Sequence, residues 1–290
     1  MNIKRSGNYK TGFKYYKNNQ EITNEDEIEK IRALKIPPTY ENVTILNTKK
    51  VLAFGYDSKG RKQVIYHPDF VRQRNAKKYK KIIESAHLFT KIKNKIMRDI
   101  KSQQRYTKEI AMVIYLIFNC GFRIGNEKYE KSNQSYGLTT MKFSHLTFNN
   151  KDCIEFDFIG KKGVRNQSSC NHKYICQYLK DKKNSSNDTD NVFSVKSHDV
   201  NEYLRTIDKS IHLTSKDLRT WNANHLFIKF FQDKKIQEQK NPVKRAIEQV
   251  ANELHNTPAI CKKSYIDPRI IDHANAVMEK IKLSNEKNKK

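Results

Sequence analysis

The sequence predicts an α+β fold, with a small, mostly β N-terminal domain followed by a larger, mainly α domain that carries one β-hairpin. Three observations predict this fold. Runs of β-forming residues separated by turn signals fill roughly the first 75 residues. Helical periodicity with little glycine or proline begins at Asp69, and one strongly alternating strand interrupts it at 153–164. We place the boundary near residue 76, giving domains of residues 1–76 and 77–290, with a disordered basic tail from about residue 284.

The clearest feature of the N-terminal domain is a predicted hairpin between Val51 and His67. Two β-rich runs flank a turn at 57–60, which places Lys59 and Arg61 at the tip and Tyr66 beside them. Aromatic rings mixed with positive charge are typical of a surface that grips nucleic acid, and a solvated edge without function is the alternative. The candidate nucleic-acid-binding residues along the chain are Lys59, Arg61, Tyr66, Arg74 and Tyr129.

The mainly α domain begins with charged helices and continues with a buried one. Thr107 is expected to cap this buried helix, which runs through the apolar segment 110–118 to Asn119. It ends at Cys120-Gly121, where glycine permits the left-handed closing residue. Arg123 follows directly, so it lies where the chain leaves the core.

A half-buried strand follows, because Ile154, Phe156 and Phe158 alternate with two acids. The next four residues, Gly-Lys-Lys-Gly at 160–163, predict a tight turn that holds Lys161 and Lys162 at a hairpin tip.

The C-terminal segment predicts three successive helices. Asn241 caps the first, which spans 241–254, and Pro242 occupies its first turn. Thr257-Pro258 and Asp267-Pro268 begin the next two. Tyr265 therefore lies at the end of a short helix between two capped ones.

The chain is strongly basic. In 290 residues, 57 lysines and arginines oppose 31 acids, for a formal charge of +26. This balance favours a polyanionic partner. The alternative is that an AT-rich coding sequence supplies lysines that merely solvate the surface.

Cysteine usage and apolar runs indicate the compartment. The five cysteines are odd in number and scattered, which favours free thiols in a reducing environment, and Cys170, His172 and Cys176 lack a fourth ligand, so no metal site is predicted. The start of the chain has no apolar core typical of a signal peptide, and the longest apolar run, 110–118, is too short to cross a bilayer. The chain is therefore expected to be soluble and intracellular, and its positive charge favours a DNA-associated location. If its source is viral, a virion or a viral replication site is the expected location.

Attack by a tyrosine on a DNA phosphodiester needs a defined set of side chains. Positive charge must favour the phenolate, arginines must bind the phosphate oxygens, and an acid must protonate the leaving 5′-oxygen. The sequence offers such a set in the order Arg123, Lys161, Lys216, Arg219, Asn256, Tyr265.

Two motifs in this set resemble a known family. KDLRT at 216–220 and NTPAICKKSYIDPR at 256–269 resemble the signature of type IB DNA topoisomerases of the compact poxviral and bacterial kind. The similarity continues, in the family's order, in IRALKIPPTYENV (31–43), FGYDSKGRKQVIYHPDF (54–70), GFRIGNEKY (121–129), YGLTTMK (136–142) and FIGKKGV (158–164).

The resemblance implies the fold of the tyrosine recombinase/topoisomerase IB catalytic core and a role for each residue. Tyr265 is the implied nucleophile, which forms a 3′-phosphotyrosyl link, and Arg123 and Arg219 bind the scissile phosphate. Lys161 protonates the leaving oxygen and Lys216 assists, while Lys162 is a neighbouring candidate for the same task. Poxviral members have histidine where this chain has Asn256. An amide still donates a hydrogen bond, so Asn256 is assigned to the site and His255 is a lesser candidate.

The implied activity is relaxation of supercoiled duplex DNA by a monomer clamped on the duplex, without ATP and without an essential divalent metal. The sequence contains no phosphate-binding GxxxxGK[ST] loop. One alternative is a tyrosine site-specific recombinase, although KDLRT departs from that family's HxLRH-like box. The other alternative is a noncatalytic architectural DNA-binding protein.

Overall fold

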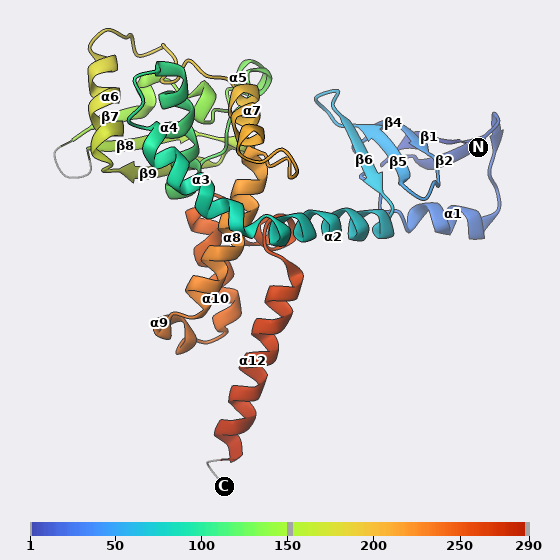
Figure 1. Cartoon of the computed structure of the whole chain (residues 1–290). Coiled ribbons are helices and arrows are strands. Elements are labelled where there is room, and N and C mark those ends of the chain that lie inside the picture. Colours follow the sequence, from blue (N-terminus) through green and yellow to red (C-terminus); the bar gives the residue numbers. More distant parts are fainter. Residues whose placement is uncertain (1, 150–152, 288–290) are drawn as a thin grey trace. The chain divides into compact units, whose positions relative to one another are not determined.

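The structure is a computed structural model that describes residues 2–149 and 153–287. It divides into two compact units, Met1–Lys80 and Lys81–Lys290, and the division falls inside helix α2 (Pro68–Glu84), which also contains the expected boundary near residue 76. An antiparallel sheet forms most of the first unit and helices form most of the second (Figure 1). The predicted α+β class is confirmed.

The first unit is built on a six-stranded antiparallel sheet with the strand order β3-β2-β1-β4-β5-β6. Its elements are β1 (Ile3–Asn8), β2 (Gly12–Lys17), β3 (Gln20–Glu21), α1 (Glu25–Arg32), β4 (Glu41–Ile45), β5 (Val51–Tyr56) and β6 (Lys62–Tyr66). The small core contains Tyr15, Ile31, Val43, Ile45 and Ala53. The predicted hairpin is confirmed as β5–β6, and Gly60 in its turn has a φ of 68°, a conformation that glycine adopts without strain.

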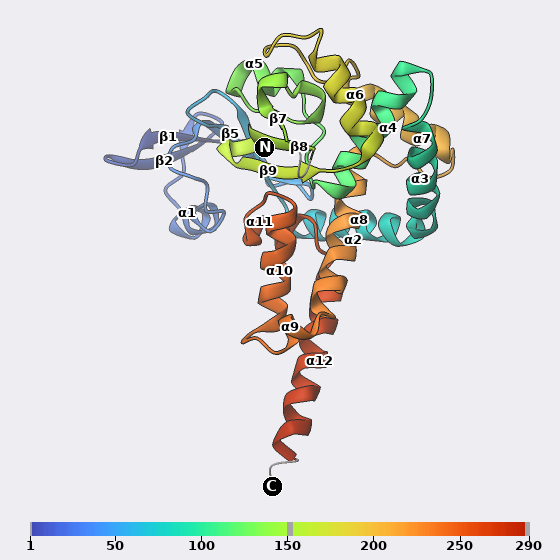
Figure 2. The same ribbon diagram turned by 90° about the vertical axis from the view of Figure 1, so that its left-hand side faces the viewer.

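Helices pack around one large core in the second unit. They are α3 (Ala86–Asp99), α4 (Arg105–Asn119), α5 (Glu127–Asn133), α6 (Lys173–Lys183), α7 (Ser197–Ile207), α8 (Ser215–Phe231), α9 (Lys234–Gln237), α10 (Pro242–Glu253), α11 (Pro258–Ser264) and α12 (Pro268–Lys287). A second core joins the C-terminal half of α8 to α9–α12. In both views α8 and α10 lie side by side, while α12 continues beyond them (Figures 1 and 2).

The buried helix α4 differs from its prediction at the start and agrees at the end. It begins at Arg105 with Gln104 in the cap position, and the Thr107 hydroxyl donates to the Gln104 side chain (3.2 Å) from within the first turn. The helix ends at Cys120, and Gly121 has a φ of 62° as predicted. A Cβ atom on Gly121 would collide with the Glu253 carbonyl oxygen. Glycine is thus required where the end of α4 meets the end of α10.

A three-stranded antiparallel sheet supports the lysine hairpin. It consists of β7 (Leu146–Phe148), β8 (Ile154–Ile159) and β9 (Arg165–Cys170). The predicted alternation is confirmed, since Ile154, Phe156 and Phe158 are buried and the residues between them are exposed. A 3-10 turn, Lys161–Gly163, joins β8 to β9. It therefore holds Lys161 and Lys162 at the tip, in solvent.

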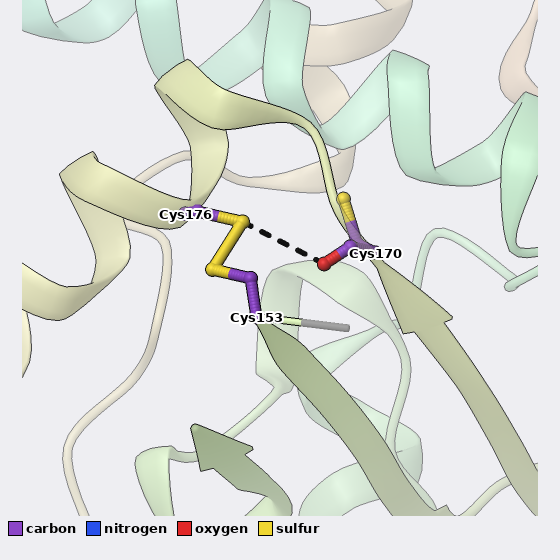
Figure 3. The surroundings of a disulfide bond; sticks show 3 residues. All are labelled: Cys153, Cys170 and Cys176. Atoms are coloured by element: carbon purple, nitrogen blue, oxygen red, sulfur yellow. Dashed lines mark hydrogen bonds between the residues drawn. A yellow bond between two sulfur atoms is a disulfide. The ribbon is translucent and has the colours of Figure 1, made fainter. Parts of the chain in front are cut away.

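The prediction that all cysteines are free thiols is wrong for one pair. Cys153 and Cys176 form a disulfide with a Cα–Cα distance of 6.0 Å, and the Cys176 sulfur also lies 3.6 Å from the Cys170 carbonyl oxygen (Figure 3). Cys120, Cys170 and Cys261 are free and buried. The pairing was not visible in the sequence because it depends on α6 packing beside the start of β8.

The last helix extends past the predicted start of a disordered tail. Helix α12 continues to Lys287, so residues 284–287 are helical, and the rest of the predicted tail, 288–290, lies outside the described residues. Adding residues to an existing helix needs no new nucleus, which accounts for the extension. No helix among the described residues has the length and apolar character needed to span a membrane.

Candidate active site

Helix α8 supplies the central side chain of the site. Its first turn is fixed by a capping box, in which Thr214 accepts from the Asp217 amide and Asp217 accepts from the Thr214 amide (2.9 Å). One turn further, the Arg219 side chain points into the core and is only 3% exposed. Lys216, three residues before Arg219 on the same helix, is exposed.

Arg219 ties the ends of two other helices together. Its Nη1 donates to the Gly121 carbonyl oxygen, after α4, and its Nη2 donates to the Leu254 carbonyl oxygen, at the end of α10 (3.0 Å). Carbonyl groups at helix C-termini lack intrahelical partners and carry partial negative charge. These two carbonyl groups therefore satisfy part of the hydrogen-bonding capacity of the buried guanidinium. Burial lowers the pKa of Arg219 to about 10, so it stays charged at neutral pH.

Arg123 reaches the same place from the segment after α4. Its backbone is held by the Leu138 amide, which donates to the Arg123 carbonyl oxygen (2.9 Å). Its Nη2 donates to Oδ1 of Asn256, just after α10. The structure thus brings Arg123 and Asn256 together, although 133 positions separate them.

Tyr265 is the C-cap of α11, so the predicted position at the end of a short helix is confirmed. The Arg219 guanidinium carbon lies 5.4 Å from the centre of the Tyr265 ring. Burial by itself would raise the pKa of Tyr265, but the positive charges of Arg219 and Arg123 outweigh burial and lower it. The phenolate is therefore more accessible at Tyr265 than at an ordinary tyrosine.

Asn224 is a member of this site that the sequence analysis missed. Its Nδ2 donates to the Tyr265 carbonyl oxygen (3.0 Å), and its Oδ1 accepts from the Asp267 amide (2.7 Å). Asn224 is buried one turn beyond Arg219 on α8. The sequence offered no usable signal for it, because a single asparagine on a helix gives no indication of a distant backbone partner.

Several hydrogen-bond donors at the site have no partner within the described part of the chain. Arg123 Nη1, Arg219 Nε and Asn256 Nδ2 are buried and have no hydrogen-bond partner among the described residues. Buried polar groups are normally paired, so three unpaired donors beside one tyrosine require an explanation. All three prefer an anionic acceptor or an acceptor with several lone pairs, and a phosphate offers both.

His255 has structural partners. Its φ of 48° closes α10, its Nε2–H donates to the Cys120 carbonyl oxygen (2.9 Å), and its ring stacks on Phe122 with 5.3 Å between centroids. Burial lowers its pKa, which keeps the ring neutral near pH 7.

Two predicted residues are not brought to the tyrosine. Lys161 and Lys216 are exposed, and neither side chain bonds to Tyr265, Arg123 or Arg219 within the part of the chain that the structure describes. The Lys161 hairpin is nevertheless tied to the Arg123 segment. The Tyr136 amide donates to the Ile159 carbonyl oxygen (2.9 Å), and the neighbouring Gly137 packs against the Arg123 carbonyl oxygen.

The candidate nucleic-acid-binding residues differ in their surroundings. Lys59 is exposed at the β5–β6 turn, and Tyr129 is 52% exposed on α5. Arg61 pairs with Asp57 (2.7 Å), and this hydrogen bond holds the pKa of Asp57 at about 2. The Arg74 guanidinium lies 5.2 Å from the centre of the Tyr66 ring. Arg61 and Arg74 thus have partners within the first unit.

The helical unit contains a partly buried tyrosine beside two arginines, and the other unit is a basic antiparallel sheet. This combination is typical of enzymes that cleave and rejoin a nucleic-acid strand through a covalent bond to tyrosine. Comparison with known proteins narrows the class. Residues 59–290 match the family model of the eukaryotic DNA topoisomerase I catalytic core, and residues 12–57 match that of the bacterial DNA topoisomerase IB N-terminal domain. The chain belongs to the eukaryotic DNA topoisomerase I family and is a type IB DNA topoisomerase, which confirms the predicted resemblance, function and enzyme class.

Viral relatives cover most of the chain. DNA topoisomerase 1B of Acanthamoeba polyphaga mimivirus is 28% identical over 278 residues, which are 87% of this chain and 81% of the relative. DNA topoisomerase 1B of vaccinia virus (strain Copenhagen) is 27% identical over 258 residues, covering 84% and 81%. A cellular relative, DNA topoisomerase 1 of Schizosaccharomyces pombe, is 26% identical over 53% of this chain and 19% of its own length.

Proposed function

We propose that Tyr265 is the nucleophile that cleaves one strand of duplex DNA. Its phenolate attacks the scissile phosphorus, so a bond forms between the tyrosine oxygen and phosphorus while the bond from phosphorus to the 5′-oxygen breaks. The products are a 3′-phosphotyrosyl link and a free 5′-hydroxyl. The lowered pKa of Tyr265 beside Arg219 and Arg123 supports this assignment, because the nucleophile must lose its proton.

The observation that carries the proposal is the set of unpaired donors beside Tyr265. The unpaired donors are Arg123 Nη1, Arg219 Nε and Asn256 Nδ2, none of which has an acceptor among the described residues. In the transition state, negative charge grows on the non-bridging phosphate oxygens, and donors fixed in advance stabilise it without reorganisation. Two guanidiniums also supply positive charge at this point, so the step requires no divalent metal for that purpose.

Lys161 is proposed as the general acid. The leaving 5′-oxygen of deoxyribose is strongly basic and needs a proton as its bond to phosphorus breaks. Lys161 is exposed at the tip of a hairpin that is anchored beside Arg123, and it must approach the phosphate when DNA binds. Lys216, exposed one turn before Arg219, is proposed to assist it.

Relaxation then follows from the covalent intermediate. The free 5′ strand rotates about the intact strand, and attack of the 5′-hydroxyl on the phosphotyrosine restores the DNA and the phenol. The phosphotyrosyl diester retains the free energy of the bond it replaced, so resealing needs no ATP. We propose that the chain acts as a monomer, with both units on one duplex and with Lys59, Arg61, Tyr66, Arg74 and Tyr129 among the DNA-contacting residues.

The direct test is covalent trapping. The chain is incubated, in EDTA and without ATP, with a labelled duplex whose short 5′ leaving strand diffuses away after cleavage. We expect a covalent complex whose digestion yields a single DNA-modified peptide containing Tyr265. A label on another residue would contradict the proposal. Plasmid relaxation under the same conditions tests turnover, and a requirement for two target sites would instead indicate recombination.

A further inference from the structure

A groove with no role in the proposed chemistry lies in the helical unit. It has a volume of about 970 Å³ and is formed by the start of α10, one face of α11 and the middle of α12. Its apolar lining includes Pro242, Val243, Ile247, Pro258, Ile271 and Met278. Four lysines, Lys240, Lys244, Lys262 and Lys282, also line it, and Glu279 is the one acid among its described lining residues. We call it the α10–α12 groove.

The groove and the tyrosine site use different faces of α11. Pro258, Ala259 and Lys262 contribute to the groove, and Lys262 follows the other two at spacings of four and three residues, which places them on one face. Cys261 and Tyr265, also four apart, belong to the core that packs against α8. Among the described residues, none of Tyr265, Arg219, Arg123 and Asn256 lines the groove. An occupant of the groove therefore does not have to be the scissile DNA segment.

Helix α12 has an apolar stripe along one face. At this groove the stripe continues beyond the neighbouring helices that cover its beginning. Ile271 and Ala274 are 4% and 2% exposed, where the helix packs against its neighbours. Met278 continues the stripe into the groove, and Ile281 follows it at 42% exposure. This spacing of three and four residues is that of one helix face. The described chain buries the first half of the stripe, while Met278 is half-buried and Ile281 is exposed.

The charge around the groove indicates which kind of partner would bind there. Four lysines against one glutamate favour an acidic partner. The start of α10 adds to this preference, because the Asn241 side chain makes no capping hydrogen bond there and the amide groups of the first turn carry partial positive charge. A DNA backbone would use the lysines but would leave the apolar floor wet, since its outer surface is phosphate and sugar. An amphipathic helix satisfies both the apolar floor and the lysines.

We propose that the α10–α12 groove is the docking site for an acidic, amphipathic helix of a partner protein. The apolar face of that helix covers Met278, Ile281 and the groove floor, and its carboxylates lie toward Lys244 and Lys282. The proposal is independent of the chemistry at Tyr265. Its consequence is recruitment of the topoisomerase to an assembly while the tyrosine site stays open to DNA.

The test uses a designed helical peptide as the probe. The labelled peptide has leucines at i, i+3, i+4 and i+7 and glutamates at most other positions, and a scrambled peptide of the same composition is the control. Binding to the full chain is measured by fluorescence anisotropy at fixed salt. Two charge-reversal pairs are compared: Lys244→Glu with Lys282→Glu in the groove, and Lys209→Glu with Lys229→Glu on exposed positions outside it.

We expect the groove pair to weaken binding of the patterned peptide about 10-fold or more, and the outside pair to weaken it less than about 2-fold. Met278→Glu should weaken it similarly while plasmid relaxation is retained. Equal binding of the scrambled peptide, or no effect of the groove pair, would overturn the proposal. It would also be overturned if duplex DNA displaced the peptide and the groove pair lowered duplex affinity much more than the outside pair, because the groove would then be a DNA contact.

Discussion

The Arg219 guanidinium carbon lies 5.4 Å from the centre of the Tyr265 ring, while the same guanidinium donates to carbonyl groups at the ends of α4 and α10. One buried cation thus connects the proposed nucleophile to the ends of α4 and α10. Its charge stabilises the phenolate, and its hydrogen bonds fix the segments that carry Arg123 and Asn256. Loss of Arg219 is expected to disturb both functions, whereas loss of Arg123 should disturb the chemistry alone.

Tyr265→Phe is expected to abolish covalent DNA capture and plasmid relaxation, because it removes the attacking oxygen and leaves the packing of the ring unchanged. Noncovalent duplex affinity, measured by gel shift, should stay within about 2-fold of the original since phosphate contacts dominate affinity. Tyr174→Phe, at an exposed tyrosine of α6, serves as the control and should relax DNA normally. An unaffected relaxation rate in the Tyr265 variant would refute the nucleophile assignment.

Arg123→Ala should move the phenolate titration of Tyr265 to higher pH. The charge of Arg123 helps to lower this pKa in the DNA-free enzyme, so without it a higher pH is needed to remove the phenolic proton. The shift can be measured by ultraviolet difference titration against Tyr265→Phe. The loss of a phosphate donor should also slow cleavage by about 10²- to 10³-fold.

The control for the Arg123 variant is Arg245→Ala, at an arginine on α10 that pairs with Glu248 (2.9 Å) in solvent. It should change neither the titration nor the cleavage rate. A Tyr265 titration that stays in place in Arg123→Ala would show that Arg123 does not act on the phenol.

Arg219→Ala should destabilise the helical unit. The change leaves the carbonyl groups of Gly121 and Leu254 buried without their donor, at a cost of about 2–4 kcal/mol in the free energy of unfolding. Arg123→Ala, by comparison, should cost less than about 1 kcal/mol, because Arg123 is only partly buried. Urea denaturation followed by circular dichroism compares the two variants. Equal midpoints would contradict the framework role of Arg219.

Lys161→Ala should slow cleavage of ordinary DNA and leave cleavage of a modified DNA largely unaffected. The modified substrate carries sulfur in place of the 5′-bridging oxygen, and a thiolate leaves without a proton. Rates are measured under single-turnover conditions for both substrates. Lys162→Ala is the matched control on the same hairpin tip. If sulfur rescues the Lys162 variant and not the Lys161 variant, the acid is Lys162.

Asn224→Ala should slow cleavage by about 10-fold or more without weakening duplex binding, since small displacements of a reacting group are costly. Asn224 holds the backbone on both sides of Ile266, at Tyr265 and Asp267. Asn222→Ala, which removes a bond from the same helix to the Phe118 carbonyl oxygen (3.0 Å), is the control for general loss of a buried amide. Equal cleavage rates in the two variants would indicate that Asn224 has no special effect on Tyr265.

The local sequence determined where most of the candidate residues lie along the fold. Gly121 ended α4, the turn at 160–163 placed Lys161 at a hairpin tip, and two Pro-initiated helices placed Tyr265 between them. These features follow from backbone preferences that act over a few residues, so a sequence specifies them directly. The family resemblance then supplied the roles that such local features do not reveal.

Only the tertiary structure decided which of those residues meet. Arg219 reaches carbonyl groups 98 and 35 positions away, Asn224 reaches the backbone 41 and 43 positions away, and Cys153 pairs with Cys176. Such contacts depend on how α4, α8, α10 and α11 pack, and no short-range preference encodes that packing. Lys161 lies on the predicted hairpin tip, and both Lys161 and Lys216 are exposed.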